Sequence, residues 1–139
     1  MRTRRMSDIV RNCQPITLRG DATVQHACKL MHGHRIGAIL VTDAEGRLEG
    51  IFTGRDAVRL LAEGRSPAHT HLCAVMTYNP TTMAPEHNAV EALRLMQDGG
   101  FRHVPLAQDG KLIGIASAAD FRAVEHARLD DETGYWERL

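Results

Sequence analysis

The sequence predicts a mixed α+β fold in which one β-α-β-β-α unit occurs twice, because the chain repeats itself and each copy alternates helical and strand patterns. Residues 21–56 recur as residues 86–120. The copies stay in register except at one turn, where the four residues 43–46 correspond to the three residues 108–110. A change of length confined to a turn is what a duplicated fold tolerates. In a chain of 139 residues, two such copies are expected to share one core around a pseudo-two-fold axis.

Each copy contains a first helix whose apolar residues recur at i, i+3, i+4 and i+7, the spacing of one helical face. These residues are Val24, Ala27, Cys28 and Met31 in the first copy and Ala89, Ala92, Leu93 and Met96 in the second. Asp21 is the expected N-cap of the first helix. Gly33 and the pair Gly99–Gly100 are the expected stop signals.

A hairpin of two short apolar strands follows each first helix, and a second helix ends each copy. The expected hairpins are Ala38–Thr42 with Leu48–Phe52, and His103–Ala107 with Leu112–Ala116. The expected second helices are Gly54–Ala62 and Ala118–Leu129, and short strands at Pro15–Leu18 and Thr81–Met83 precede the first helices. Residues 63–70 have linker composition, which places the first repeat at 1–70, the second at 71–128 and a polar tail at 129–139.

Composition is that of an ordinary globular chain. Seventeen basic and seventeen acidic side chains cancel, so neither a nucleic acid nor a membrane is expected as a partner. No apolar run approaches the roughly 20 residues of a membrane-spanning helix, and no signal peptide is visible, so we expect a cytoplasmic chain. Three widely spaced cysteines without a C-x-x-C pair indicate neither a disulfide framework nor a structural zinc site. Cys28 is expected to serve as a small hydrophobe.

One short phrase closes both hairpins: a strand ends, a hydroxyl residue follows, and a carboxylate stands three residues later in the first helical turn. The pairs are Thr53 with Asp56 and Ser117 with Asp120. One interpretation is a capping box, in which both side chains satisfy backbone donors at the start of the helix. The other is a nucleotide site, because a helix N-terminus attracts phosphate and an ionised carboxylate accepts hydrogen bonds from ribose hydroxyls. Both interpretations stay open at this point.

The two phrases, together with the segments Ile36–Asp43 and Phe101–Leu106, resemble a tandem pair of CBS domains (the cystathionine β-synthase domain family) over roughly residues 6–124. The resemblance implies two β-α-β-β-α repeats packed sheet to sheet, with two symmetry-related clefts between them. It implies that these clefts bind an adenosine-containing regulatory ligand such as AMP, ADP, ATP, NAD or S-adenosylmethionine, with no cofactor required. The expected function is a homodimeric, stand-alone sensor that signals to a separate effector protein.

The resemblance also assigns roles to individual residues. Asp56 and Asp120 resemble the carboxylates that bind ribose, and Thr53 and Ser117 resemble the residues beside the phosphates or ribose. The segments that resemble the lining of the base pocket, Ile16–Leu18, Gly37–Ile39, Thr81–Met83 and His103–Pro105, include Ile16, Thr17, Gly37, Ala38, Ile39, Thr82, Met83, His103, Val104 and Pro105. The second copy departs from the family pattern at Ala116, where a larger aliphatic residue is usual. Its cleft is therefore expected to be roomier or vacant.

Basic residues near the phrases are candidates for contacting phosphate. Arg55 adds a cation to the helical turn after Thr53, whereas the second copy has only alanines there. The Asp56 site is therefore expected to prefer phosphorylated adenosine over adenosine. Arg102 and His103 begin the first hairpin strand of the second copy, where alternation lets at most one of them face a given cleft. A surface arginine without a ligand role is the alternative for this pair.

Rival functions have weaker support. The pairs His32/His34 and His69/His71 invite a metal hypothesis, but no cysteine or carboxylate stands at ligand spacing beside them. An enzyme is not expected, because no nucleophile–base pair, glycine-rich phosphate loop or metal triad is discernible. The main alternative is a structural dimerisation module with vacant clefts and a partner docked on Tyr135–Trp136. Apolar positions beyond one inward stripe predict a homodimer through the second helices: Val58, Leu60, Leu61, Phe121 and Val124.

Overall fold

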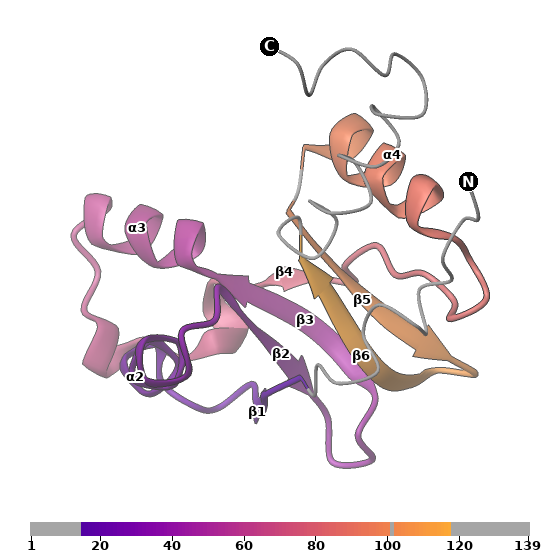
Figure 1. Ribbon diagram of the computed structural model, residues 1–139. Helices are drawn as coiled ribbons and strands as arrows, with labels where there is room; N and C mark the ends of the chain where they lie inside the picture. Colours follow the sequence, from indigo (N-terminus) through magenta and orange to yellow (C-terminus); the bar gives the residue numbers. More distant parts are fainter. Residues whose placement is uncertain (1–14, 101, 118–139) are drawn as a thin grey trace, which may run out of the picture. The chain divides into compact units, whose positions relative to one another are not determined.

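Figure 1 shows the computed structural model of the chain, which describes residues 15–100 and 102–117. These residues form two compact units. One unit is built on residues 15–81 together with 109–113, and the other on residues 82–108 and 114–117. Each unit combines helix with antiparallel strands, so the mixed α and β architecture expected from the sequence is confirmed.

The first unit contains a four-stranded sheet in the spatial order β1-β2-β3-β4, with bounds Thr17–Arg19, Ala38–Thr42, Leu48–Thr53 and Thr77–Tyr78. Strand β1 runs parallel to β2, whereas β2 with β3 and β3 with β4 are antiparallel. The parallel pair needs a crossover, which helix α2 (Val24–His34) supplies. Helix α3 (Gly54–Ala62) follows β3 without an intervening loop. The predicted β-α-β-β-α order is therefore present in the first unit.

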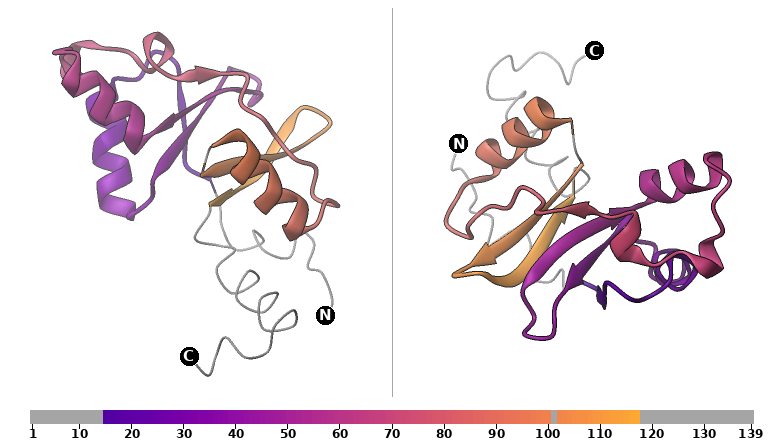
Figure 2. Two further views of the ribbon diagram at one scale, coloured as in Figure 1. Left: turned by 90° about the horizontal axis from the view of Figure 1, so that it is seen from above. Right: turned by 180° about the vertical axis from the view of Figure 1, so that it is seen from behind.

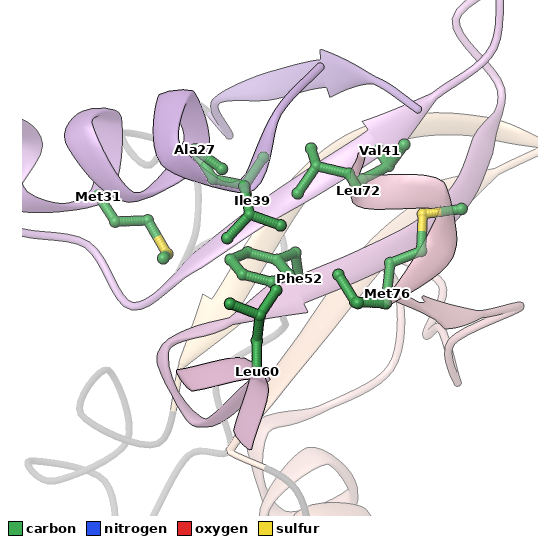
Figure 3. Packing of buried hydrophobic residues seen from close by; sticks show 10 residues of the cluster. Ala27, Met31, Ile39, Val41, Phe52, Leu60, Leu72 and Met76 are labelled. Atoms are coloured by element: carbon green, nitrogen blue, oxygen red, sulfur yellow. The ribbon is translucent and has the colours of Figure 1, made fainter. Parts of the chain in front are cut away.

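The two helices of this unit share one apolar core with the sheet. Ile39 of β2 and Phe52 of β3 are cross-strand partners, and both side chains are fully buried. Met31 of α2 and Leu60 of α3 reach this pair from the helices, as Figure 3 shows. Burying a side chain of this size contributes about 1.5–3 kcal/mol. Packing of Leu60 therefore fixes α3, and the phrase at its start, against the end of β3.

Helix α2 begins later than the sequence suggested. Its N-cap is Thr23, whose hydroxyl accepts the His26 N–H at 3.1 Å, so the assignment of Asp21 as N-cap was wrong. The physical reason is that residues 20–23 are held in pairing with residues 71–73. The amide of Leu72 donates to the Ala22 carbonyl at 2.9 Å, and Thr23 forms an isolated bridge with His71. The preceding strand also differs, because β1 occupies Thr17–Arg19 rather than Pro15–Leu18.

The C-terminal end of α2 lies two residues beyond the expected stop. Gly33 is inside the helix, and Arg35 terminates it in the left-handed region at φ 55°. The Ile36 amide then donates back to the Met31 carbonyl at 3.0 Å, the six-to-one bond of a Schellman motif. Arg35, a charged residue with positive φ, therefore terminates the helix in place of the expected Gly33.

The second unit contains helix α4 (Ala89–Gly99), which packs against β5 (His103–Gln108) and against residues 114–117 of the hairpin partner of β5, β6 (Lys111–Ser117). Figure 2 shows α4 alongside this hairpin from two further directions. Asp109 and Gly110 form the hairpin turn with φ values of 53° and 80°, and Gly100 caps α4 as expected. The strand expected at Thr81–Met83 is not formed, because only Met83 pairs, through an isolated parallel bridge to Leu106. The helix expected at 118–129 lies outside the described residues.

A short edge strand was missed by the sequence-based prediction. After α3 the chain forms two 3-10 turns, η1 (Pro67–His69) and η2 (Leu72–Ala74), and then adds β4 to the open edge of β3. The close approach requires Gly50, since a Cβ there would lie 2.7 Å from Met76 Sδ and 2.8 Å from the Thr77 carbonyl oxygen. The repeated glycine of the phrase thus has a packing reason in the first unit.

Candidate ligand-binding site

The first phrase adopts the geometry of a capping box. Thr53 is both the last residue of β3 and the N-cap of α3. Its hydroxyl oxygen accepts the Asp56 N–H at 3.3 Å, and Asp56 Oδ2 accepts the Thr53 N–H at 2.9 Å. The capping interpretation is therefore correct for this pair as a description of local structure. Because strand and helix join directly at Thr53, the carboxylate is held at the end of the sheet.

The Asp56 carboxylate is buried but has acceptor capacity left. Only 8% of the residue is exposed. Oδ2 also accepts the Thr53 hydroxyl at 3.1 Å, and Oδ1 lies 3.4 Å from the Arg59 guanidinium. A carboxylate offers about four lone-pair sites. The three contacting donors therefore leave about one acceptor site, on Oδ1.

Arg59 was not among the residues singled out from the sequence. Its Nη2 contacts Asp56 and also donates to the Val75 backbone carbonyl at 3.0 Å. The first contact could have been anticipated, because a basic residue three positions after an acidic one lies on the same helix face. The second contact spans 16 residues and has no local signal.

Two base-pocket residues lie beside the phrase. Ala38 is the cross-strand partner of Thr53, and the Gly54 N–H donates to the Gly37 carbonyl at 3.1 Å. Ile16 is half-buried and its carbonyl accepts the Leu40 N–H, while Thr17 is exposed on β1. The Ile39 side chain packs in the core beneath the helices. Only the backbone of Ile39 is therefore available beside the phrase.

Arg55 is exposed in the first turn of α3. The N–H groups of Gly54 and Asp56 in this turn are already bonded, but the turn keeps the partial positive charge of a helix N-terminus. Arg55, the residue before Asp56, therefore lies at the phosphate-attracting end of the helix, as expected from its position in the sequence.

The second copy is described only in part. The amide of Met83 donates to the Pro105 carbonyl, and the Ala107 amide donates to the Met83 carbonyl, each at 3.0 Å, which brings these two base-pocket segments together. Met83, Val104 and Pro105 are buried, His103 is half-buried, and Thr82 and Arg102 are exposed. Ser117 is half-buried at the end of β6. Asp120 lies outside the described residues.

The histidine pairs have ordinary surroundings. His32 and His34 are exposed in the last turn of α2, and the His69 ring nitrogen Nδ1 lies 3.0 Å from the Ser66 hydroxyl. Within residues 15–100 and 102–117, no group of three or more His, Cys, Asp or Glu side chains is placed to hold a metal ion.

Cys28 packs against the apolar core of the first unit as expected, and burial raises the pKa of its thiol. None of the helices in this part of the chain has the length and apolar character needed to cross a bilayer.

Comparison with known proteins identifies the family. The CBS domain model matches the chain twice, at residues 6–63 and 72–126. The chain is 39% identical over 107 residues to the CBS domain-containing protein CBSCBSPB2 of Arabidopsis thaliana, a match that covers 76% of this chain and 20% of the relative. It likewise spans about a fifth of the length of four further Arabidopsis relatives.

Solved structures agree with this match. The CBS-domain containing protein ATU1752 from Agrobacterium tumefaciens is 32% identical, with a TM-score of 0.79, covering 90% of this chain and 99% of that one. The CBS domain protein PAE2072 from Pyrobaculum aerophilum, solved in complex with AMP, shares the fold at 22% identity with a TM-score of 0.82, covering 89% of this chain and 97% of that one. The chain belongs to the CBS domain family and carries two of its domains in tandem.

Proposed function

We propose that the chain is a regulatory module that binds an adenosine-containing ligand at the Thr53–Asp56 phrase and at its counterpart, Ser117–Asp120. The observation that carries the proposal is the buried Asp56 carboxylate, which stands at a helix N-terminus with about one acceptor site unused. A ribose diol supplies the donors that such a carboxylate needs, and the helix end favours phosphate. The AMP bound by PAE2072, which has the same fold, supports this ligand class.

In the proposed complex each part of the phrase has a distinct role. Asp56 accepts the ribose hydroxyls, and Thr53, whose hydroxyl stays on Oδ2, holds the carboxylate in place beside the phosphate or ribose. Gly37 and Ala38 provide backbone beside the base, since they adjoin Thr53 through the sheet. Arg55 adds a cation for phosphate, which makes AMP a better ligand than adenosine at this site. The ligand acts as a regulatory signal to a separate effector protein, with no cofactor required.

A thermal-shift titration with AMP and adenosine tests this function. A ligand at 100 times its dissociation constant adds about 2.7 kcal/mol per site, which raises the melting temperature by several degrees. Asp56→Ala should remove the part of the melting-temperature shift that comes from ligand bound at its own site. Arg55→Ala should reduce the shift caused by AMP more than the shift caused by adenosine.

Glu91→Ala is the control for the loss of a carboxylate from the first turn of a helix. Glu91 occupies the same position in α4 that Asp56 occupies in α3: its N–H donates to the Asn88 side chain at 2.8 Å, and its carboxylate lies 3.2 Å from Asn88 Nδ2. This variant should melt earlier but keep the full ligand response. If Asp56→Ala also keeps the full response, Asp56 is a cap only and the ligand role is refuted.

A second candidate function is a structural homodimerisation module. Val58 and Leu61, three positions apart on α3, are 66% and 62% exposed, whereas Leu60 is buried in the core. An exposed apolar pair on one helix face favours contact with another subunit. We therefore retain the homodimer as part of the proposal.

A further inference from the structure

The guanidinium of Arg59 joins two segments of the first unit that are far apart in sequence. Its Nη2 lies 3.4 Å from Asp56 Oδ1 and donates to the Val75 carbonyl at 3.0 Å. Asp56 stands in the first turn of α3, whereas Val75 ends the turn η2 just before β4. The Arg59 side chain is 54% exposed, whereas the Asp56 side chain is 11% exposed. One half-exposed cation therefore bridges the candidate ligand site and the approach to the edge strand.

The segment that Arg59 reaches is buried in the core at its start, through Val75 and Met76, and is held by few contacts beyond that point. Met76 packs against Gly50, and β4 pairs with β3 through Thr77 and Tyr78. The Asn79 amide then donates to the Glu49 carbonyl at 3.0 Å, and the second unit begins three residues later. A two-residue edge strand has little ladder of its own, so contacts at its ends decide how often it opens. The Asn79 amide is therefore a direct reporter of this segment.

A diol at Asp56 would change the Arg59 contacts. Two hydroxyl donors need two acceptor sites, and the carboxylate has about one unused. The Arg59 contact is the longest of those to Asp56, at 3.4 Å, and the exposed guanidinium can satisfy its other N–H groups with water. A ligand hydroxyl therefore takes the Oδ1 site most easily from Arg59. The displaced Nη2 then keeps the Val75 carbonyl as its partner among the described residues of this unit.

On the basis of the proposed ligand function, we propose that Arg59 is a positioning residue that orients Asp56 and couples occupancy of its carboxylate to the segment Val75–Asn79. Ligand binding shifts the guanidinium toward Val75 and tightens the segment. Lysine can replace this function only in part, because a flexible ammonium lacks the rigid planar group that holds Nη2 against both acceptors.

Hydrogen exchange of backbone amides in the full chain, first without ligand, tests the bridge. Arg59→Met should speed exchange at Asn79 about fivefold, the fold-change that corresponds to losing one hydrogen bond of ordinary strength. Arg59→Lys should give a smaller increase. Arg94→Met, which removes an exposed arginine from α4, should leave Asn79 unchanged. The Leu40 amide, which is bonded to the Ile16 carbonyl inside the sheet, reports that each variant is folded. Equal exchange at Asn79 in the parent and Arg59→Met overturns the proposal.

The same measurement with saturating AMP tests the coupling. AMP should slow Asn79 exchange in the parent and leave it unchanged in Arg59→Met, although calorimetry still detects AMP binding to that variant. An equal slowing in both proteins contradicts the coupling, because a purely structural Arg59 would not alter the ligand response. If AMP does not bind the parent, the proposed function fails at this ligand, and the ligand-free comparison still decides whether Arg59 holds the segment.

Discussion

At the scale of single residues, one carboxylate meets two demands. Asp56 completes the cap of α3 through the Thr53 amide and also faces Arg59, so its local role is structural. The same contacts would orient it for the proposed ligand, because they fix the rotamer of a buried group without using all of its lone pairs. The capping box and the nucleotide site, which the sequence left as alternatives, are therefore compatible on one side chain.

Gly50→Ala should destabilise the first unit by about 1–3 kcal/mol, the usual cost of overpacking. The added methyl would lie 2.7 Å from Met76 Sδ and 2.8 Å from the Thr77 carbonyl oxygen. The methionine can move, but the backbone oxygen belongs to β4. Urea unfolding of the two proteins measures the difference.

Gly33→Ala is the control of opposite sign. A methyl there meets nothing within 4 Å, and the residue lies inside α2 without a positive φ. Replacing a helical glycine by alanine raises the free energy of unfolding by about 0.4–1 kcal/mol. If Gly50→Ala is as stable as the parent, the close approach of β4 to β3 is not the reason for this glycine.

At the scale of elements, the parts that follow from local pattern were predicted well. The bounds of β2 and α3 agree with the expectation, because an apolar run and an amphipathic stripe end at clear turn residues. The errors occur where distant contacts override local signals. Residues 20–23 pair with residues 71–73, which delays α2, and β4 forms only because β3 has an open edge. The Val75 contact of Arg59 was unpredictable for the same reason.

The start of α2 provides a test of this explanation. Thr23→Ala should lower the free energy of unfolding by about 1 kcal/mol, since it removes the side chain that caps the His26 amide. Asp21→Ala should stay within about 0.5 kcal/mol of the parent, because Asp21 is exposed and precedes the cap. Thermal unfolding of both variants decides the point. A larger loss for Asp21→Ala would restore it as the capping residue.

At the scale of the whole molecule, we expect two chains to associate through the exposed face of α3. Val58→Ser combined with Leu61→Ser should shift the mass measured by light scattering from dimer toward monomer at tens of micromolar protein, because both side chains are exposed in the single chain. The control is Ile113→Ser, which removes an apolar residue that is 44% exposed on β6. A monomeric parent would refute the homodimer.

The central claim, that Asp56 binds the ribose of an adenosine ligand, is tested most directly by calorimetric titration with AMP and with its 2′,3′-dideoxy analogue. The analogue keeps the base and phosphate but lacks both hydroxyls that the carboxylate would accept. Hydrogen bonds to a charged group contribute about 1.5–3 kcal/mol each, so the parent should bind AMP at least about tenfold more tightly. Asp56→Ala should lose one AMP-preferring site per chain, while Glu91→Ala should lose none. Equal affinity of the parent for the two ligands, or an unchanged number of AMP-preferring sites in Asp56→Ala, would contradict the claim.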